Sequence, residues 1–224
     1  IIIKNGIVID GTNKPKYKSD IGINSNKIEK IGSLENTNAK KIIDASGLII
    51  SPGFIDIHTH SDISVINDPL NESKIFQGVT TEVTGNCSYS PFPSGNSDPN
   101  TLKEELWEKR GNADDPNTIW EWTTFDEYAK YIEEKQTSLN IAPQVGYAAL
   151  QIASGSVENR RATEDELEKM KKLANESIEQ GAFSLSTGLS VPPSAFASTE
   201  EIIEICKSIS HYDNVFYVTH AREG

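Results

Sequence analysis

Hydrophobic residues over the first fifty positions come in short runs that are separated by turn-forming residues. The runs are rich in isoleucine and valine, and pairs such as Asn5-Gly6 and Asp10-Gly11 interrupt them. Short β-branched runs between such pairs are typical of strands that are joined by tight turns. We therefore predict a small antiparallel β-sheet domain over residues 1–52.

The pattern changes after residue 53, where apolar runs of strand length alternate with helical patterns. The predicted strands lie near residues 54–60, 79–85, 142–148, 182–187 and 215–220. Three of the helices are expected to begin at capping boxes, in which Glu follows a Ser or Thr N-cap by three residues. These boxes pair Thr124 with Glu127, Thr163 with Glu166, and Ser198 with Glu201. Strands that alternate with helices favour a parallel sheet with its crossovers outside.

Residues 53–224 form the second predicted domain, with a polar insert at about 88–124. The insert carries three tryptophans, which we expect to anchor loop packing rather than to contact a ligand. They are Trp107, Trp120 and Trp122. Before the insert, a helix is expected to begin with Asp68 as its N-cap and to end at Gly78.

Side chains that can bind a metal lie at the carboxyl ends of three predicted strands. His58 and His60 end the first strand on one face, Cys87 follows the second strand, and His220 ends the fifth. A (β/α)8 barrel builds its active site at this end of its strands. Three imidazoles and one thiolate suit zinc, although two histidines at a strand end also serve as plain polar caps.

The strand count suggests part of a larger fold. Five strands are visible, whereas eight close such a barrel. We therefore expect an α/β fold, namely the N-terminal part of a (β/α)8 TIM barrel preceded by the small β-sheet domain. An open five-stranded sheet is the alternative.

The composition limits the binding partners and the cellular compartment that we expect for this protein. The formal net charge of -12 argues against binding to nucleic acid or to an anionic membrane surface. No apolar run is long enough to span a bilayer, and two cysteines make no disulfide framework, so a cytoplasmic location is expected. Cys206 shares an apolar helical stripe with three isoleucines and is expected in the core, whereas Cys87 lies in a turn.

Five segments carry motifs that occur in one order along nearly the whole chain. They are Pro-Gly-Phe-Ile-Asp-Ile-His-Thr-His-Ser-Asp (52–62), Gln-Gly-Val-Thr-Thr-Glu-Val-Thr-Gly-Asn-Cys (77–87), Ser-Pro-Phe-Pro (90–93), Gly-Ala-Phe-Ser-Leu-Ser-Thr-Gly-Leu (181–189) and Val-Thr-His-Ala-Arg-Glu (218–223). Together they resemble the D-aminoacylase and N-acyl-D-amino-acid deacylase group of the amidohydrolase superfamily. The first motif is common across the superfamily, whereas the cysteine motif and the Ser-Thr-Gly-Leu motif are more specific to this group.

The resemblance implies zinc-dependent hydrolysis of the amide bond of an N-acyl-D-amino acid, a small-molecule substrate, to give a carboxylate and a free D-amino acid. It assigns His58 and His60 to one metal position, and Cys87 and His220 to the other, tighter one. The catalytic Asp and the remaining histidine are then expected beyond residue 224, so residues 1–224 alone are expected to be barely active. Arg222 is a candidate to bind the substrate carboxylate, with a salt bridge to a neighbour such as Glu223 as the alternative.

Two other functions stay open at this stage. One is a hydantoinase-like or dihydroorotase-like cyclic amidase; many amidohydrolases carry a carboxylated lysine at the fourth strand, and this strand has no lysine. The other is a metal-binding but inactive fragment. The chain departs from the family pattern at residues 146–151 and at Val191, which leaves open the preferred acyl group and side chain. The number of metal ions and the oligomeric state are also left open.

Overall fold

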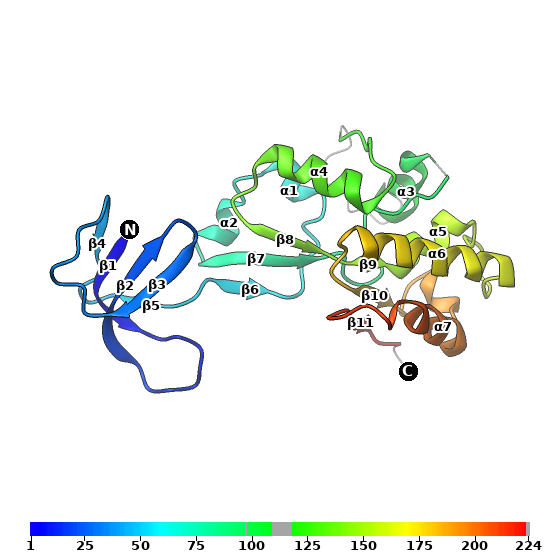
Figure 1. Cartoon of the computed structure of the whole chain (residues 1–224). Coiled ribbons are helices and arrows are strands. Elements are labelled where there is room, and N and C mark those ends of the chain that lie inside the picture. The colour runs from blue at the N-terminus through cyan, green and yellow to red at the C-terminus, as the bar shows by residue number, and fades with distance from the viewer. Residues whose placement is uncertain (97, 109–117, 223–224) are drawn as a thin grey trace. The chain divides into compact units, whose positions relative to one another are not determined.

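The computed structural model describes residues 1–96, 98–108 and 118–222, which divide into two compact units (Figure 1). The units are Ile1–Gly53 and Phe54–Gly224. Within the described ranges, no helix combines the length and the apolar character that crossing a membrane requires.

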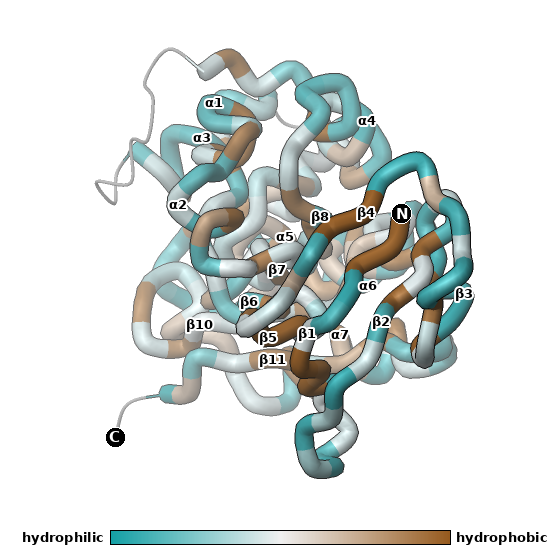
Figure 2. Tube along the Cα trace, turned by 90° about the vertical axis from the view of Figure 1, so that its left-hand side faces the viewer, coloured by the Kyte–Doolittle hydropathy of each residue, from teal (hydrophilic) through white to brown (hydrophobic). Residues whose placement is uncertain are grey.

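The first unit is a five-stranded sheet in the order β3-β2-β1-β4, with β5 also beside β1. Its strands are β1 (Ile2–Val8), β2 (Tyr17–Asn24), β3 (Lys27–Gly32), β4 (Ile42–Asp44) and β5 (Ile49–Ile50). Ile2, Val8 and Ile21 are buried in it, and Figure 2 shows apolar positions of β1 and β5 in brown.

The prediction of a purely antiparallel sheet is wrong for this unit. β1 pairs antiparallel with β2, and β2 with β3, but β4 and β5 both pair parallel with β1. Residues 33–41 carry the chain back to the start of β1, where Ile42 lies opposite Ile2. A connection of this length permits a parallel return, which a two-residue hairpin does not.

The second unit contains the predicted parallel strands in chain order. They are β6 (Phe54–Asp56), β7 (Val79–Thr84), β8 (Asn140–Pro143), β9 (Val145–Gly146), β10 (Leu185–Gly188) and β11 (Tyr217–His220). β6, β7 and β8 pair parallel, as do β9, β10 and β11. The third predicted strand is divided at the buried residue Gln144, so two three-stranded sheets follow one another along the chain. The predicted parallel order is confirmed.

Seven α-helices and one short 3-10 helix accompany these strands in the described residues. They are α1 (Ser64–Asn67), α2 (Glu72–Ile75), α3 (Pro99–Leu106), α4 (Phe125–Lys135), α5 (Tyr147–Ser154), α6 (Glu164–Gln180), η2 (Ser194–Phe196) and α7 (Thr199–Ile209). All three predicted capping boxes are formed, at the starts of α4, α6 and α7.

The prediction that a helix begins at Asp68 is wrong. Asp68 ends α1, where its N–H donates to the carbonyl of Ser64, and a turn follows. The second short helix begins after Asn71, which has a left-handed backbone, and Gly78 with φ +83° follows that helix. The local preference of Asp-Pro for a helix start is overridden because Val65 and Ile66 of α1 are buried in the core.

The tryptophans of the insert pack in the core, as predicted. Trp107, Trp120 and Trp122 are all buried, and the indole N–H of Trp122 donates to the carbonyl of Pro91 at 2.8 Å. Cys206 is half-buried on α7 and packs against the same core. The apolar stripe on α7 therefore has the packing role that its spacing predicted.

A buried carboxylate ties α2 to the strands beneath it. Glu82 on β7 is fully buried, and the ammonium of Lys74 lies 3.1 Å from its carboxylate and 2.6 Å from that of Asp56. Removing the cation would leave the charge of Glu82 buried without its counter-ion. The Lys74–Glu82 pair therefore contributes more to the stability of the fold than a surface salt bridge does.

We expect Lys74→Met to lower the free energy of unfolding by about 2–3 kcal/mol, somewhat less than for a wholly buried pair because Lys74 is partly exposed. Lys130→Met is the matched control, since Lys130 pairs with Asp126 at an exposed site and its loss should cost much less than the loss of Lys74. Denaturant unfolding of both variants measures the difference, and equal losses would contradict the special role of Lys74.

Candidate metal centre

The two histidines of the first motif lie after their strand rather than on it. β6 ends at Asp56, so the prediction that His58 and His60 belong to a regular strand is wrong. The loop is held by the N–H of His58, which donates to Asp56 Oδ1, and by that of Thr59, which donates to the Val83 carbonyl. The rings still lie together, with centroids 5.5 Å apart.

Cys87 stands at the centre of the predicted metal residues. Its Sγ lies 3.4 Å from Nε2 of His58 and 3.6 Å from Nδ1 of His220. The donor atoms of His58, His60 and Cys87 all fall within 4.8 Å of one another. The structure thus gathers three of the four residues that the sequence singled out for a metal, and the fourth, His220, lies beside Cys87.

These separations fit a zinc ion. Sulfur and nitrogen ligands at about 2.3 Å and 2.0 Å from one tetrahedral zinc lie about 3.5 Å apart. The distances of 3.4 Å from Cys87 to His58 and 3.6 Å from Cys87 to His220 lie on either side of that value. Thiolate and imidazole are also donors that suit zinc, whereas magnesium and calcium bind mainly oxygen ligands.

Burial affects the protonation of two of these residues in opposite senses. Burial, followed by the like charges of His58 and His220, lowers the pKa of His60, which favours the neutral imidazole that binds metals. Burial raises the pKa of the Cys87 thiol. A bound cation would reverse that second effect, because a coordinated thiol is deprotonated.

The loop that carries Cys87 has an unusual backbone. Cys87 and Ser88 both have left-handed conformations, with φ +54° and φ +75°. Such residues persist where the surroundings over-determine them, and they gather at functional sites. Here the N–H of Ser88 donates to Ser186 Oγ at 3.2 Å, Ser186 Oγ donates to the Gly85 carbonyl, and the N–H of Gly188 donates to Ser88 Oγ.

β10 approaches this loop so closely that it requires glycine. A Cβ added to Gly188 would lie 2.3 Å from the carbonyl oxygen of Cys87. The backbone of the fourth parallel strand therefore packs directly against the backbone of the cysteine.

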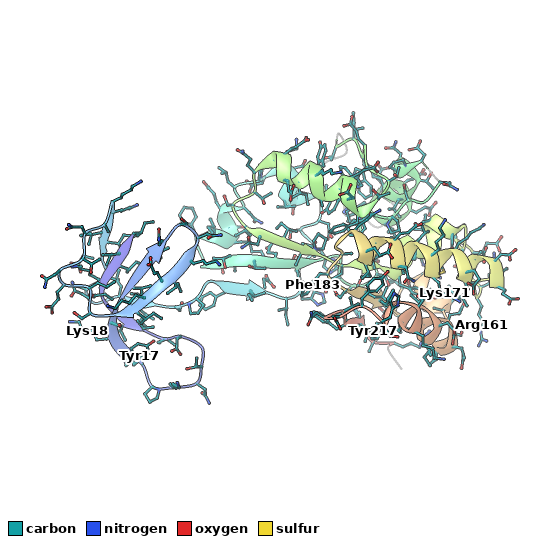
Figure 3. All side chains as sticks on the ribbon, in the orientation of Figure 1. Tyr17, Lys18, Arg161, Lys171, Phe183 and Tyr217 are labelled. Atoms are coloured by element: carbon teal, nitrogen blue, oxygen red, sulfur yellow. The ribbon has the colours of Figure 1, made fainter. Side chains whose placement is uncertain are left out.

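β11 places His220 beside this loop. In the parallel register of β10 and β11, His220 lies opposite Gly188, and its carbonyl accepts from the N–H of Leu189 at 3.0 Å. The hydroxyl of Tyr217, labelled in Figure 3, lies 2.6 Å from Thr187 Oγ1 and adds a side-chain link between the two strands. His220 is thus positioned by the sheet itself.

Arg222 donates hydrogen bonds to two backbone carbonyls. Its Nη1 donates to the Ala195 carbonyl at 2.6 Å and its Nη2 to the Ala197 carbonyl at 2.7 Å. The guanidinium thus holds the segment that follows β10. Glu223 lies outside the described residues, and binding of a substrate carboxylate by Arg222 stays a prediction.

Two carboxyl groups lie near the histidines. A hydrogen bond from Lys74 holds the pKa of Asp56 below its ordinary value, so this group is an ion-pair partner. Burial raises the pKa of Asp62 to about 7. Nothing in the sequence marks Asp62 for a separate role, since its polar type alone does not reveal that it is fully buried.

A second group of residues has a role that the sequence did not predict. Asn86, Gln144 and Ser184 are fully buried and are linked by side-chain hydrogen bonds. The available signal was their polar type inside otherwise apolar or turn segments. That signal is weak, because it does not show which partner each side chain meets.

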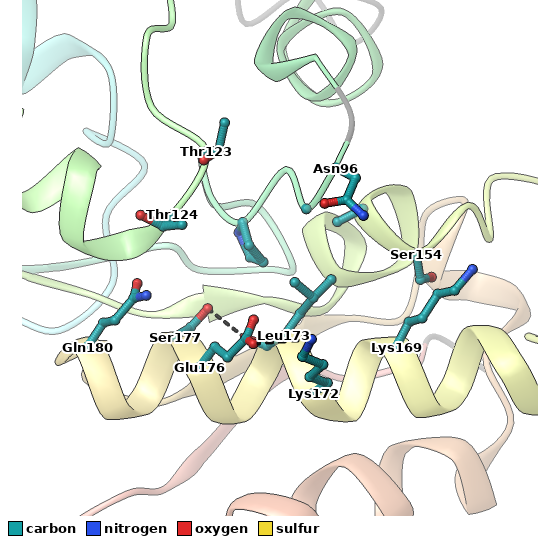
Figure 4. A pocket seen from close by; sticks show the side chains of 13 residues that line it. Asn96, Thr123, Thr124, Ser154, Lys169, Lys172, Leu173, Glu176, Ser177 and Gln180 are labelled. Atoms are coloured by element: carbon teal, nitrogen blue, oxygen red, sulfur yellow. Dashed lines mark hydrogen bonds and ion pairs between the residues drawn. The ribbon is translucent and has the colours of Figure 1, made fainter.

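The hollow drawn in Figure 4 belongs to a different part of this unit. Its volume is about 540 Å³, and Lys169, Lys172 and Glu176 of α6 line one side of it. Lys172 lies 3.6 Å from Glu176, and Ser177 bonds to its own helix. None of the four predicted metal residues lines this hollow, so we do not assign the chemistry to it.

The chain is similar in sequence to known amidohydrolases. A family described as "Amidohydrolase family" matches residues 41–201. A D-aminoacylase of Alcaligenes xylosoxydans xylosoxydans is 36% identical over 223 residues, which cover 100% of this chain and 44% of that protein. The chain therefore spans less than half the length of this curated relative.

Two solved structures are also similar. A crystal structure described as D-aminoacylase that "defines a novel subset of amidohydrolases" has a TM-score of 0.86 at 38% identity, over 99% of this chain and 45% of that one. An N-acyl-D-glutamate deacylase from Bordetella bronchiseptica, complexed with zinc and a phosphonate inhibitor, has a TM-score of 0.85 at 30% identity, with the same coverage of 99% and 45%.

Proposed function

We propose that this chain, which belongs to the amidohydrolase family, supplies the metal-binding part of a zinc-dependent enzyme that hydrolyses the amide bond of N-acyl-D-amino acids. The observation that carries the proposal is the convergence of His58, His60 and His220 on Cys87. The similarity to D-aminoacylase and to a zinc-bound deacylase supports the same substrate class.

The four residues would hold zinc through three imidazoles and one thiolate, at one position or at two, with His58 and His60 serving one and Cys87 and His220 the other. When bound, zinc supplies a Lewis acid that acidifies water and polarises an amide carbonyl. The chain contributes the arrangement of the donors: the loop after β6 presents His58 and His60, the loop after β7 presents Cys87, and β11 presents His220. Arg222 is the proposed contact for the substrate carboxylate.

The remaining parts of the catalytic apparatus are proposed for the whole protein. Five parallel strand positions are in place, and further strands would complete a (β/α)8 barrel. The resemblance to the D-aminoacylase group supports a catalytic Asp and another histidine ligand beyond residue 224. Since loss of a general base typically costs about 10²- to 10⁴-fold in rate, we propose that residues 1–224 alone hydrolyse substrate barely or not at all.

A cyclic amidase is the less favoured function. Many amidohydrolases bridge two metals with a carboxylated lysine at the fourth strand, and β10 reads Leu185-Ser186-Thr187-Gly188. Ser186 bonds the Gly85 carbonyl, and Gly188 lies against Cys87. This strand end therefore supports the cysteine loop and supplies no bridging lysine.

The test uses the purified full-length protein with N-acetyl-D-methionine, its L-enantiomer and a 5-substituted hydantoin. We expect hydrolysis of the D-compound in clear preference to the other two, as measured by release of the free amine. Removal of metal with dipicolinate should abolish turnover, and added zinc should restore it. Preferred cleavage of the hydantoin, or full activity after verified metal removal, would contradict the proposal.

A further inference from the structure

The side-chain amide of Asn86 joins the two loops that carry the proposed metal ligands. Its Nδ2 donates to the Thr59 carbonyl at 3.2 Å and to the Val83 carbonyl at 2.8 Å. Thr59 stands between His58 and His60, and Asn86 directly precedes Cys87. One buried amide group therefore connects the His-x-His segment to the cysteine segment.

The orientation of this amide is set from the opposite side. Gln144 Nε2 donates to Asn86 Oδ1 at 2.9 Å, and Ser184 Oγ donates to Gln144 Oε1 at 2.6 Å. All three side chains are fully buried. Because Gln144 supplies a donor to the oxygen of Asn86, the NH2 group of Asn86 must face the two carbonyls.

The backbone around Asn86 leaves little room for adjustment. A Cβ added to Gly85 would lie 2.2 Å from the Gln144 carbonyl oxygen, so the residue before Asn86 is packed against the break between β8 and β9. The N–H of Tyr89 donates to the Asn86 carbonyl at 2.9 Å, which closes the turn around Cys87. A change in the Asn86 contacts would therefore be transmitted to Cys87.

We propose that Asn86 is a positioning residue that sets the distance between the His-x-His segment and Cys87, and thereby the geometry of the metal site. The inference rests on the proposed metal-binding function. Asparagine is suited to this task because a single group accepts from Gln144 and donates to two carbonyls. An aspartate of the same shape keeps the first contact and turns the other two into contacts between oxygen acceptors.

The experiment compares full-length wild-type protein with the Asn86→Asp variant after cobalt(II) replaces the native metal. Cobalt bound to a thiolate gives a charge-transfer absorption band, which reports on Cys87 directly and does not require turnover. We expect the variant to fold with a wild-type circular dichroism spectrum, to show a weakened band, and to bind cobalt about 10- to 100-fold more weakly.

Ser177→Ala is the matched control. Ser177 is also buried, but its hydroxyl donates to the Leu173 carbonyl within α6, so it is bonded to neither a ligand segment nor the Asn86 network. It should retain the wild-type band and cobalt affinity, whatever its effect on stability. If Asn86→Asp does not fold, Asn86→Ala serves the same measurement, since it removes the two donors without adding a charge.

The outcomes are distinguishable. A folded Asn86 variant with an unchanged band and affinity would overturn the inference, as would an equal loss in Ser177→Ala. Wild-type protein that shows no thiolate–cobalt band would overturn the proposed function together with this inference.

Discussion

Replacement of Cys87 with alanine is expected to remove bound zinc and nearly all hydrolytic activity of the full-length protein. Its sulfur lies within 3.6 Å of both His58 and His220, so its loss would take the central donor from the site. Mutation of groups that merely orient a metal ligand typically costs 10- to 100-fold, so loss of the ligand itself should exceed about 100-fold in kcat/KM. Elemental analysis and steady-state kinetics on the same sample measure both effects.

Cys206→Ala is the natural control, because Cys206 is the other cysteine of the chain. It lies on α7, half-buried against the hydrophobic core, and has no role in the proposed site. This variant should keep its zinc and activity while losing roughly 1 kcal/mol of packing. Unchanged zinc content in Cys87→Ala would exclude Cys87 as a ligand, whatever happened to activity.

The second large effect is expected at Gly188, although its substitution adds only one methyl group. That methyl would lie 2.3 Å from the carbonyl oxygen and 2.7 Å from the carbonyl carbon of Cys87. Since both neighbours are backbone atoms, the clash must displace the loop or β10. We expect Gly188→Ala to lower the free energy of unfolding by about 1–3 kcal/mol and to release most of the zinc.

Gly155→Ala separates general destabilisation from damage to the site. Gly155 ends α5 with φ +94°, and an added Cβ meets no atom within 4 Å, so alanine there costs only backbone strain, about 1 kcal/mol. It should destabilise the protein while leaving zinc content unchanged. Retention of wild-type zinc in Gly188→Ala would show that the close approach of β10 does not govern the cysteine loop.

Local chemistry along the chain was enough to predict several elements. The capping boxes at Thr124, Thr163 and Ser198 all formed, because N-cap and N3 side chains satisfy N–H groups within one helical turn. The same holds for the parallel strands, whose apolar runs alternate with helical patterns. His58, His60, Cys87 and His220 could be chosen as a group because the ends of parallel strands meet at one edge.

Tertiary structure alone decided how those residues are held. Asn86 meets Gln144 and Thr59, and Ser186 meets Gly85, across 27 to 101 positions of sequence. No local periodicity encodes such pairs, since each depends on which strands become neighbours and in what register. The same reason explains the parallel return of β4, the break at Gln144 and the binding of Arg222 to backbone carbonyls. The sequence by itself was therefore enough to predict which side chains would gather as a candidate metal site, whereas long-range packing determined the loops and contacts that bring them together.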